Sequence, residues 1–169
     1  MKKIVLATVA AALAAAAHGR IVSMPKAGIE MDIPDSLVAL KSSNLPAGVY
    51  YYMDNATRAN VNVIVQPKEV SMEEFKKLSL EQYGKLNAKV KKAEIDTASG
   101  ALDLEVELDL GRPCTCYQRV VEVNGKFTIA TATAFEAKDK KAMRRAVSTV
   151  RVKTAKKKAA KKKTAPKIQ

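Results

Sequence analysis

The sequence predicts an α+β domain in which an antiparallel β-sheet of about six strands is flanked by helices. Apolar and polar residues alternate along much of residues 90–135, and turn residues interrupt this pattern at intervals. Residues 71–86 have helical spacing behind a recognisable N-cap, and a second helical pattern follows at 137–150. Because strands occur in blocks and do not alternate with helices, the sheet is expected to be antiparallel.

A chain of 169 residues most often forms one domain. We assign residues 1–19 to a leader, 20–152 to the folded domain and 153–169 to a basic tail. The central part is long enough to bury one core. Trp is absent and aromatic residues make up 5% of the sequence, so this core should be mostly aliphatic.

The first third of the domain contains short segments with strand composition. These segments are residues 21–24, 29–33, 49–53 and 61–65. Pro25–Gly28 forms a turn between the first two, Asp54–Thr57 precedes the fourth, and prolines at 34 and 67 end the second and fourth.

The first helix is predicted from its start signals. Ser71 is placed to cap the helix with Glu74 three residues later, and Val70 and Phe75 can form a hydrophobic staple. The predicted apolar stripe consists of Phe75, Leu78, Gln82 and Leu86, with Tyr83 beside it. The helix should end between residues 84 and 87.

Four strands and a closing helix follow. The strands are predicted at 90–95, 102–110, 115–123 and 127–135. Asn124-Gly125 is typical of a two-residue type I′ hairpin turn. The helix at 137–150 should bury Ala142, Met143, Ala146, Val147 and Val150.

The first 19 residues have the layout of a secretory signal peptide. Lys2 and Lys3 precede an uncharged apolar run, Ile4–Ala17, and cleavage sites of the A-x-A type lie before His18 and before Arg20. A membrane anchor is the alternative, but a spanning helix needs roughly 20 apolar residues. We therefore expect a periplasmic or extracellular product.

The net charge of +13 is concentrated at the end of the chain. The lysines that could bind a polyanion are Lys156, Lys157, Lys158, Lys161, Lys162 and Lys163. Residues 20–150 are close to neutral, which favours a basic arm over a basic groove. Anionic lipid, lipopolysaccharide and nucleic acid are candidate targets for this tail. The alternative is a tail that only aids solubility.

Cys114 and Cys116 allow three interpretations. An exported protein often joins its cysteines in a disulfide, within or between chains. Residues i and i+2 of a strand have Cα atoms about 6.5 Å apart, near the limit for a bridge, so an internal disulfide would need a bulge. The other two interpretations are a reduced pair and a redox or copper site, for which Met24, Met31 and Met53 are candidate sulfur ligands.

Acidic residues line one face of the strand at 102–110, namely Asp103, Glu105, Glu107 and Asp109. A straight strand spreads these groups over about 20 Å, which suits neither a calcium site nor a catalytic pair. We predict a solvated face with Lys89, Lys91 and Lys92 as cross-strand partners; a docking surface for a basic partner is the alternative. The sequence has one His and no phosphate-loop, dinucleotide-binding or zinc-protease motif.

Four features in order resemble the PsbP-like fold. They are "IEMDIPDSL", then "NVNVIVQP" before "SMEEFKKLSLEQY", the strands "ALDLEVELDL" and "CYQRVVEVNGKFTIATATA", and a helix ending in "VSTVRV". This fold occurs in extrinsic proteins of photosystem II, Ran-binding import factors and small exported bacterial proteins such as DcrB. The resemblance covers residues 21–152 and implies an α/β/α sandwich.

The same resemblance implies docking to partners and not catalysis. We therefore expect an exported, non-enzymatic binding or scaffold protein that needs no cofactor and docks a partner in the cell envelope. Polyanion tethering through the tail is the alternative function, and a redox or copper site at Cys114 and Cys116 is a third.

Overall fold

The computed structural model describes residues 19–40, 45–46 and 48–153. Most of the leader and all of the six lysines Lys156–Lys158 and Lys161–Lys163 lie outside the described residues. Both helices of the described part are too short and too polar to cross a membrane.

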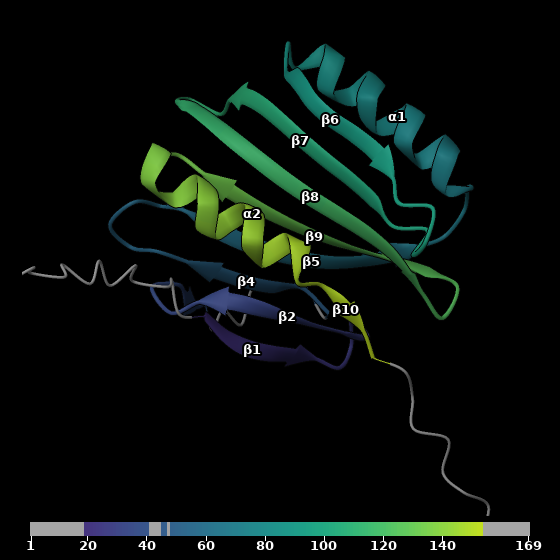
Figure 1. Cartoon of the computed structure of the whole chain (residues 1–169), viewed down its shortest axis with the longest axis horizontal. Coiled ribbons are helices and arrows are strands. Elements are labelled where there is room, and N and C mark those ends of the chain that lie inside the picture. The colour runs from purple at the N-terminus through teal and green to yellow at the C-terminus, as the bar shows by residue number, and fades with distance from the viewer. Residues whose placement is uncertain (1–18, 41–44, 47, 154–169) are drawn as a thin grey trace, which may run out of the picture.

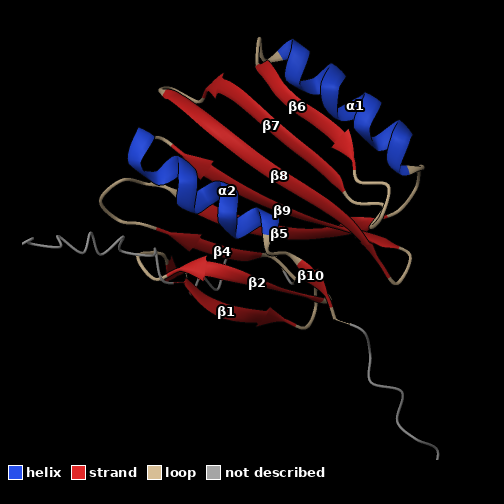
Figure 2. Ribbon diagram, in the orientation of Figure 1, coloured by secondary structure: helices blue, strands red, loops and turns tan. Residues whose placement is uncertain are grey.

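In the described part of the chain, ten strands form two antiparallel sheets (Figure 1, Figure 2). The large sheet has seven strands in the order β3-β4-β5-β9-β8-β7-β6, and the small sheet has three in the order β1-β2-β10. The strands are β1 Gly19–Met24, β2 Ile29–Pro34, β3 Val38–Ala39, β4 Tyr50–Met53, β5 Asn60–Pro67, β6 Lys89–Ile95, β7 Leu102–Asp109, β8 Pro113–Val123, β9 Lys126–Ala134 and β10 Arg151–Val152. The predicted α+β class is confirmed: the large sheet has seven strands where about six were predicted, and the described residues form a second, small sheet that was not predicted.

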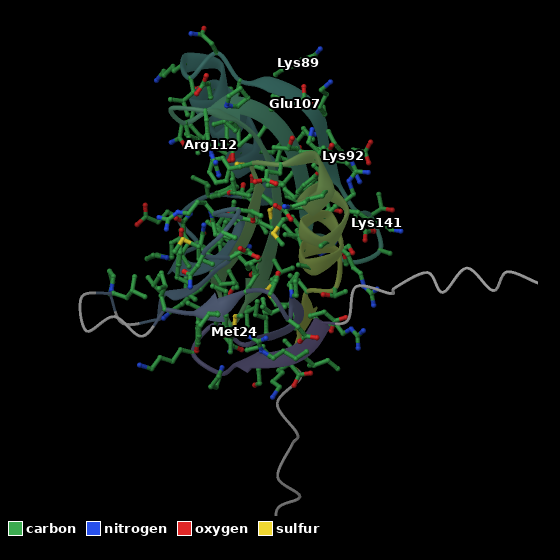
Figure 3. The ribbon with its side chains drawn as sticks, turned by 90° about the vertical axis from the view of Figure 1, so that its left-hand side faces the viewer. Met24, Lys89, Lys92, Glu107, Arg112 and Lys141 are labelled. Carbon is green, nitrogen blue, oxygen red and sulfur yellow. The ribbon has the colours of Figure 1, made fainter. Side chains whose placement is uncertain are left out.

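Two α-helices cover opposite faces of the large sheet (Figure 3). Helix α2, Lys140–Ser148, packs against β8 and β9 and against β2 of the small sheet. Helix α1, Met72–Lys85, packs against β6 and β7 on the other face. The arrangement agrees with the predicted sandwich of helices around a sheet.

The main core lies between the large sheet, α2 and the small sheet. Strand β9 presents three fully buried alanines to this layer, Ala130, Ala132 and Ala134. Short side chains on the sheet let α2 and its buried Met143 approach closely, as the dense packing of protein interiors requires. A larger side chain at any of these alanines would push the helix outward.

The meander β6–β9 forms as its alternation predicts. Leu102, Leu104 and Val106 of β7 are buried, and the intervening acidic side chains are only partly covered. Asn124 and Gly125 have φ angles of 51° and 70°, the left-handed conformation that the predicted type I′ turn requires.

Helix α1 begins as predicted, but its buried stripe differs from the prediction. The Ser71 hydroxyl accepts a hydrogen bond from the Glu74 backbone N–H at 3.1 Å. Leu78 and Leu86, both expected in the apolar stripe, are 41% and 57% exposed. Met72, Phe75, Leu80 and Tyr83 make the contacts with the sheet. The prediction was right for Phe75 and Tyr83 and wrong for Leu78 and Leu86, because α1 covers only one edge of the sheet.

The closing helix also begins later than predicted. Residues Ala137–Asp139 form a 3-10 turn, and α2 starts at Lys140. Thr149 caps its end, and its hydroxyl accepts a hydrogen bond from the Asp32 backbone N–H at 2.8 Å. This bond joins the helix end to the small sheet.

At Gly28 an added side chain would collide with a neighbouring residue. It has a φ of 68°, and an added Cβ would lie 2.5 Å from Cγ1 of Val123. Gly100 has the same φ of 68° but nothing within 4 Å of an added Cβ.

We expect Gly100→Ala to lower the free energy of unfolding by about 1 kcal/mol, because alanine disfavours this backbone conformation. Gly28→Ala should cost about 1–3 kcal/mol more because Val123 must move. Urea unfolding measures both, and equal losses would contradict the packing described here.

Candidate functional site

A groove of about 480 Å³ lies between α1 and the part of the large sheet that α1 leaves uncovered. Its volume falls within the range of about 300–1,000 Å³ that is usual for ligand pockets. The floor consists of Ile64, Gln66, Gln118, Phe127, Ile129 and Thr131. The wall and entrance consist of Pro67, Glu69, Val70, Phe75, Leu78, Ser79, Gln82 and Tyr83.

Strand register brings the floor residues together. Ile64 of β5 pairs with Ile129 of β9, and Gln118 of β8 pairs with Thr131 of β9. Paired residues of neighbouring strands point to the same face of a sheet, so these side chains form one surface. The Gln118 side-chain amide donates to the Thr131 hydroxyl at 3.1 Å and so fixes the centre of the floor.

The wall of α1 is held against the floor by an aromatic contact. The rings of Phe75 and Phe127 meet edge to face with centroids 5.0 Å apart. One turn later, the Ser79 hydroxyl donates to the Phe75 carbonyl at 2.8 Å. Beyond this contact Leu78 and Ile64 remain 41% and 37% exposed, so the groove has an apolar rim on both sides.

The groove is nearly uncharged. Of the described residues that line it, Glu69 alone carries a charge. Burial raises the pKa of Tyr83 to about 12, and the neighbouring Cys116 adds to the effect, so the phenol stays protonated at neutral pH. The amides of Gln66, Gln82 and Gln118 supply donors and acceptors. These groups suit an apolar segment that also offers backbone hydrogen bonds.

The two cysteines lie beside the groove and do not line it. Cys114 and Cys116 are 6% and 7% exposed and form a small cluster with Val106, against which Tyr83 packs. Burial raises the pKa of the Cys114 thiol from 9.0 to about 12, and Cys116 adds to the shift. Burial also raises the pKa of Cys116, although a hydrogen bond with Thr133 opposes it. Protonated thiols are poor nucleophiles and poor metal ligands.

Both thiols are free in the structure, and a disulfide stays one of the three predictions for this pair. Strand β8 pairs with β7 in unbroken register from Pro113 to Val120, without the bulge that a bridge would need. For the copper alternative, Met24 and Met31 pack in the main core, whereas the cysteines belong to a separate cluster. The described residues contain no group of three or more His, Cys, Asp and Glu side chains that could hold a metal.

The acidic stripe of β7 is a face of ion pairs, as predicted. Lys91 lies 3.1 Å from Glu107, and Lys92 lies 3.9 Å from Asp103. Figure 3 shows Lys89 and Glu107 at the top of the view and Lys92 below them. Lys89 is opposite Glu107 in the strand register, but Lys91 forms the ion pair.

Two arginines that the sequence pattern did not reveal bind the same stripe. Arg119 of β8 contacts both Asp103 oxygens at 2.9 and 3.0 Å, and Arg144 of α2 contacts both Glu105 oxygens at 2.7 and 2.9 Å. Arg144 also lies over the Tyr117 ring, 5.3 Å from its centroid. The groove was missed as well, although Gln82 in a predicted apolar stripe was a sign that this side of α1 is not fully buried.

The cysteine geometry predicts slow thiol chemistry. In the native protein both thiols should react with an alkylating reagent far more slowly than in denaturant. Because the folded pKa of Cys114 is about 12, its labelling rate should keep rising with pH above 9, whereas an unfolded thiol levels off near its ordinary pKa. Mass spectrometry follows both reactions. Rapid native labelling at pH 7, or a mass two hydrogens lower before reduction, would contradict this prediction.

Comparisons with known proteins place the fold. No family model and no curated protein matches the sequence. The Ran-binding protein Mog1p of Saccharomyces cerevisiae is 10% identical with a TM-score of 0.61, and the match covers 80% of this chain and 96% of Mog1p. Cyanobacterial PsbP (CyanoP) of Synechocystis is 17% identical with a TM-score of 0.58, covering 80% of this chain and 93% of CyanoP.

A protein of Bacteroides thetaiotaomicron is 14% identical with a TM-score of 0.54, and the match covers 81% of this chain and 49% of that one. At such low identities the likeness is one of fold. The predicted resemblance is confirmed at that level: the chain has the PsbP-like fold that Mog1p and CyanoP also adopt.

Proposed function

We propose that this chain is an exported, non-enzymatic binding protein whose groove docks a partner protein of the cell envelope. The groove between α1 and strands β5, β9 and β8 is the observation that carries this proposal. It is bordered by exposed Ile64 and Leu78, and its floor is built on paired strands. Sites on regular elements hold their shape better than sites on loops.

The chemistry of the groove defines the partner segment. Apolar side chains of the partner would bury against Ile64, Phe127 and Ile129, while the amides of Gln66 and Gln118 would receive its backbone groups. A strongly charged segment fits poorly, because the lining offers it no opposite charge apart from Glu69. Mog1p, which shares the fold, is described as a Ran-binding protein, and this likeness supports a docking role.

The leader supports the proposed location. A signal peptide with this layout would direct the chain to the periplasm or the extracellular space. Gly19 already pairs with Pro34 in β1. Cleavage before His18 would keep this whole strand, so we favour that site over cleavage before Arg20.

Polyanion tethering is a second candidate function. The backbone N–H of Lys153 donates to the Gly28 carbonyl at 2.9 Å, and its ammonium group lies 2.8 Å from both Ser23 and Glu30. The lysine-rich tail therefore leaves the domain from a fixed point close to the end of α2. Its six lysines would bind an anionic surface from there.

The groove proposal predicts different results for one substitution at Leu78 of α1 and at Leu86, the residue that caps the end of α1. Leu78→Arg places a charge in the apolar rim and should weaken partner binding by about 2 kcal/mol, or about 30-fold. Leu86→Arg is the matched control, because Leu86 is also exposed but does not line the groove. Capture from the native envelope fraction, followed by affinity measurement with the captured protein, compares the two.

A photo-crosslinker at Gln82 should join the same captured protein. Equal capture by wild type and both variants, or cross-linking only from outside the groove, would remove the support for this docking site.

The residue at which the mature chain begins shows whether the protein is exported and cleaved. We expect envelope fractions to contain a chain that starts at His18. Ala17→Phe should block cleavage because the site requires a small residue there, whereas Ala12→Phe lies within the apolar run and should be tolerated. Intact mass spectrometry of each fraction shows whether the chain has been cleaved. An uncleaved chain in the cytosol would argue against export.

A further inference from the structure

The outward face of α2 is strongly basic. Lys140, Lys141, Arg144 and Arg145 are exposed, whereas Met143, Ala146 and Val147 are buried. At about 100° per residue the four basic side chains fall within an arc of about 140° on one side of the helix. Figure 3 shows Lys141 pointing away from the sheet.

Most of this charge is not neutralised within the domain. Arg144 is held by Glu105 at 2.7 Å. Among the ion pairs of the described residues, none involves Lys140, Lys141 or Arg145. Their charges are therefore available to an external anion.

The basic face continues into the end of the chain. Helix α2 is followed after two residues by β10, where Arg151 is exposed, and Lys153 fixes the point at which the tail departs. The described chain thus ends at Lys153, close to the end of α2, whereas the sequence predicted a basic arm attached to a nearly neutral domain. Within a domain whose charges are nearly balanced, four basic side chains are gathered on this one face of α2.

We propose that the basic face of α2 docks the domain onto an anionic phospholipid membrane. Helix α2 lies flat on the sheet, so its charged groups end on one broad surface that matches the array of phosphates on a leaflet. A duplex groove would instead require the helix to project, and α2 presents no aromatic side chain on which a base could stack. This inference rests on the proposed export, which brings the chain to such a membrane.

Membrane docking through α2 also fixes the orientation of the groove. Helix α1 and the groove lie on the opposite face of the large sheet from α2. The groove would then open away from the lipid, and a partner could bind while the domain stays on the membrane.

Vesicle co-sedimentation tests the proposal with the chain from His18 onward. The vesicles contain equal parts phosphatidylglycerol and phosphatidylcholine, and phosphatidylcholine alone serves as the neutral comparison. The combined variant Lys140→Ala, Lys141→Ala, Arg145→Ala spares Arg144 because it is paired with Glu105. The matched control Lys76→Ala, Lys77→Ala, Lys85→Ala removes the same charge from α1. Circular dichroism checks that both variants fold.

The α2 variant should lose on the order of a hundredfold in affinity for the anionic vesicles, and the α1 variant about twofold or less. Wild-type binding should weaken as salt is added. Equal losses in both variants, equal binding to neutral vesicles, or tighter binding to a DNA duplex at the same salt would overturn the proposal. Partner capture distinguishes the two sites: the α2 variant should still capture the groove partner, and Leu78→Arg should still bind vesicles.

Discussion

A seven-stranded sheet has two faces to cover, and in the described residues the helix on one of them leaves an apolar groove open. Helix α2 and the small sheet bury the first face against the alanines of β9. On the second face α1 packs over β6 and β7, and its Phe75–Phe127 contact marks the limit of the covered area. The groove is the part of this second face that α1 leaves uncovered. Its position thus follows from the length and placement of a single helix, since apolar surface left open in this way favours a partner.

The two faces also differ in charge, which allows them to contact different partners. The groove is lined by apolar groups and amides. The side that carries α2 combines the ion-paired stripe of β7 with the unpaired cations of α2. Because the sheet separates these surfaces, the α2 side can bind an anionic membrane while the groove binds a protein. The buried cysteines contribute packing next to the groove and, with their raised pKa values, little reactivity.

Local patterns predicted the elements, and long-range contacts decided what they bury. The Ser71 cap, the alternation of β7 and the Asn124-Gly125 turn each depend on residues close in sequence, and each formed as predicted. The strands β3 and β10 have two residues each, too few for a pattern, and exist only because β4 and β2 lie beside them. The sequence could not reveal which side of α1 would stay open, nor that Arg144 would reach Glu105 from 39 residues away.

The central claim is that a partner occupies the space between α1 and the floor strands. Hydrogen–deuterium exchange of the mature chain, alone and with its captured partner, tests this claim directly. The account predicts added protection in β5, Asn60–Pro67, and in α1, Met72–Lys85, with little change in α2. Protection confined to α2 and the small sheet, with α1 and β5 unchanged, would contradict it.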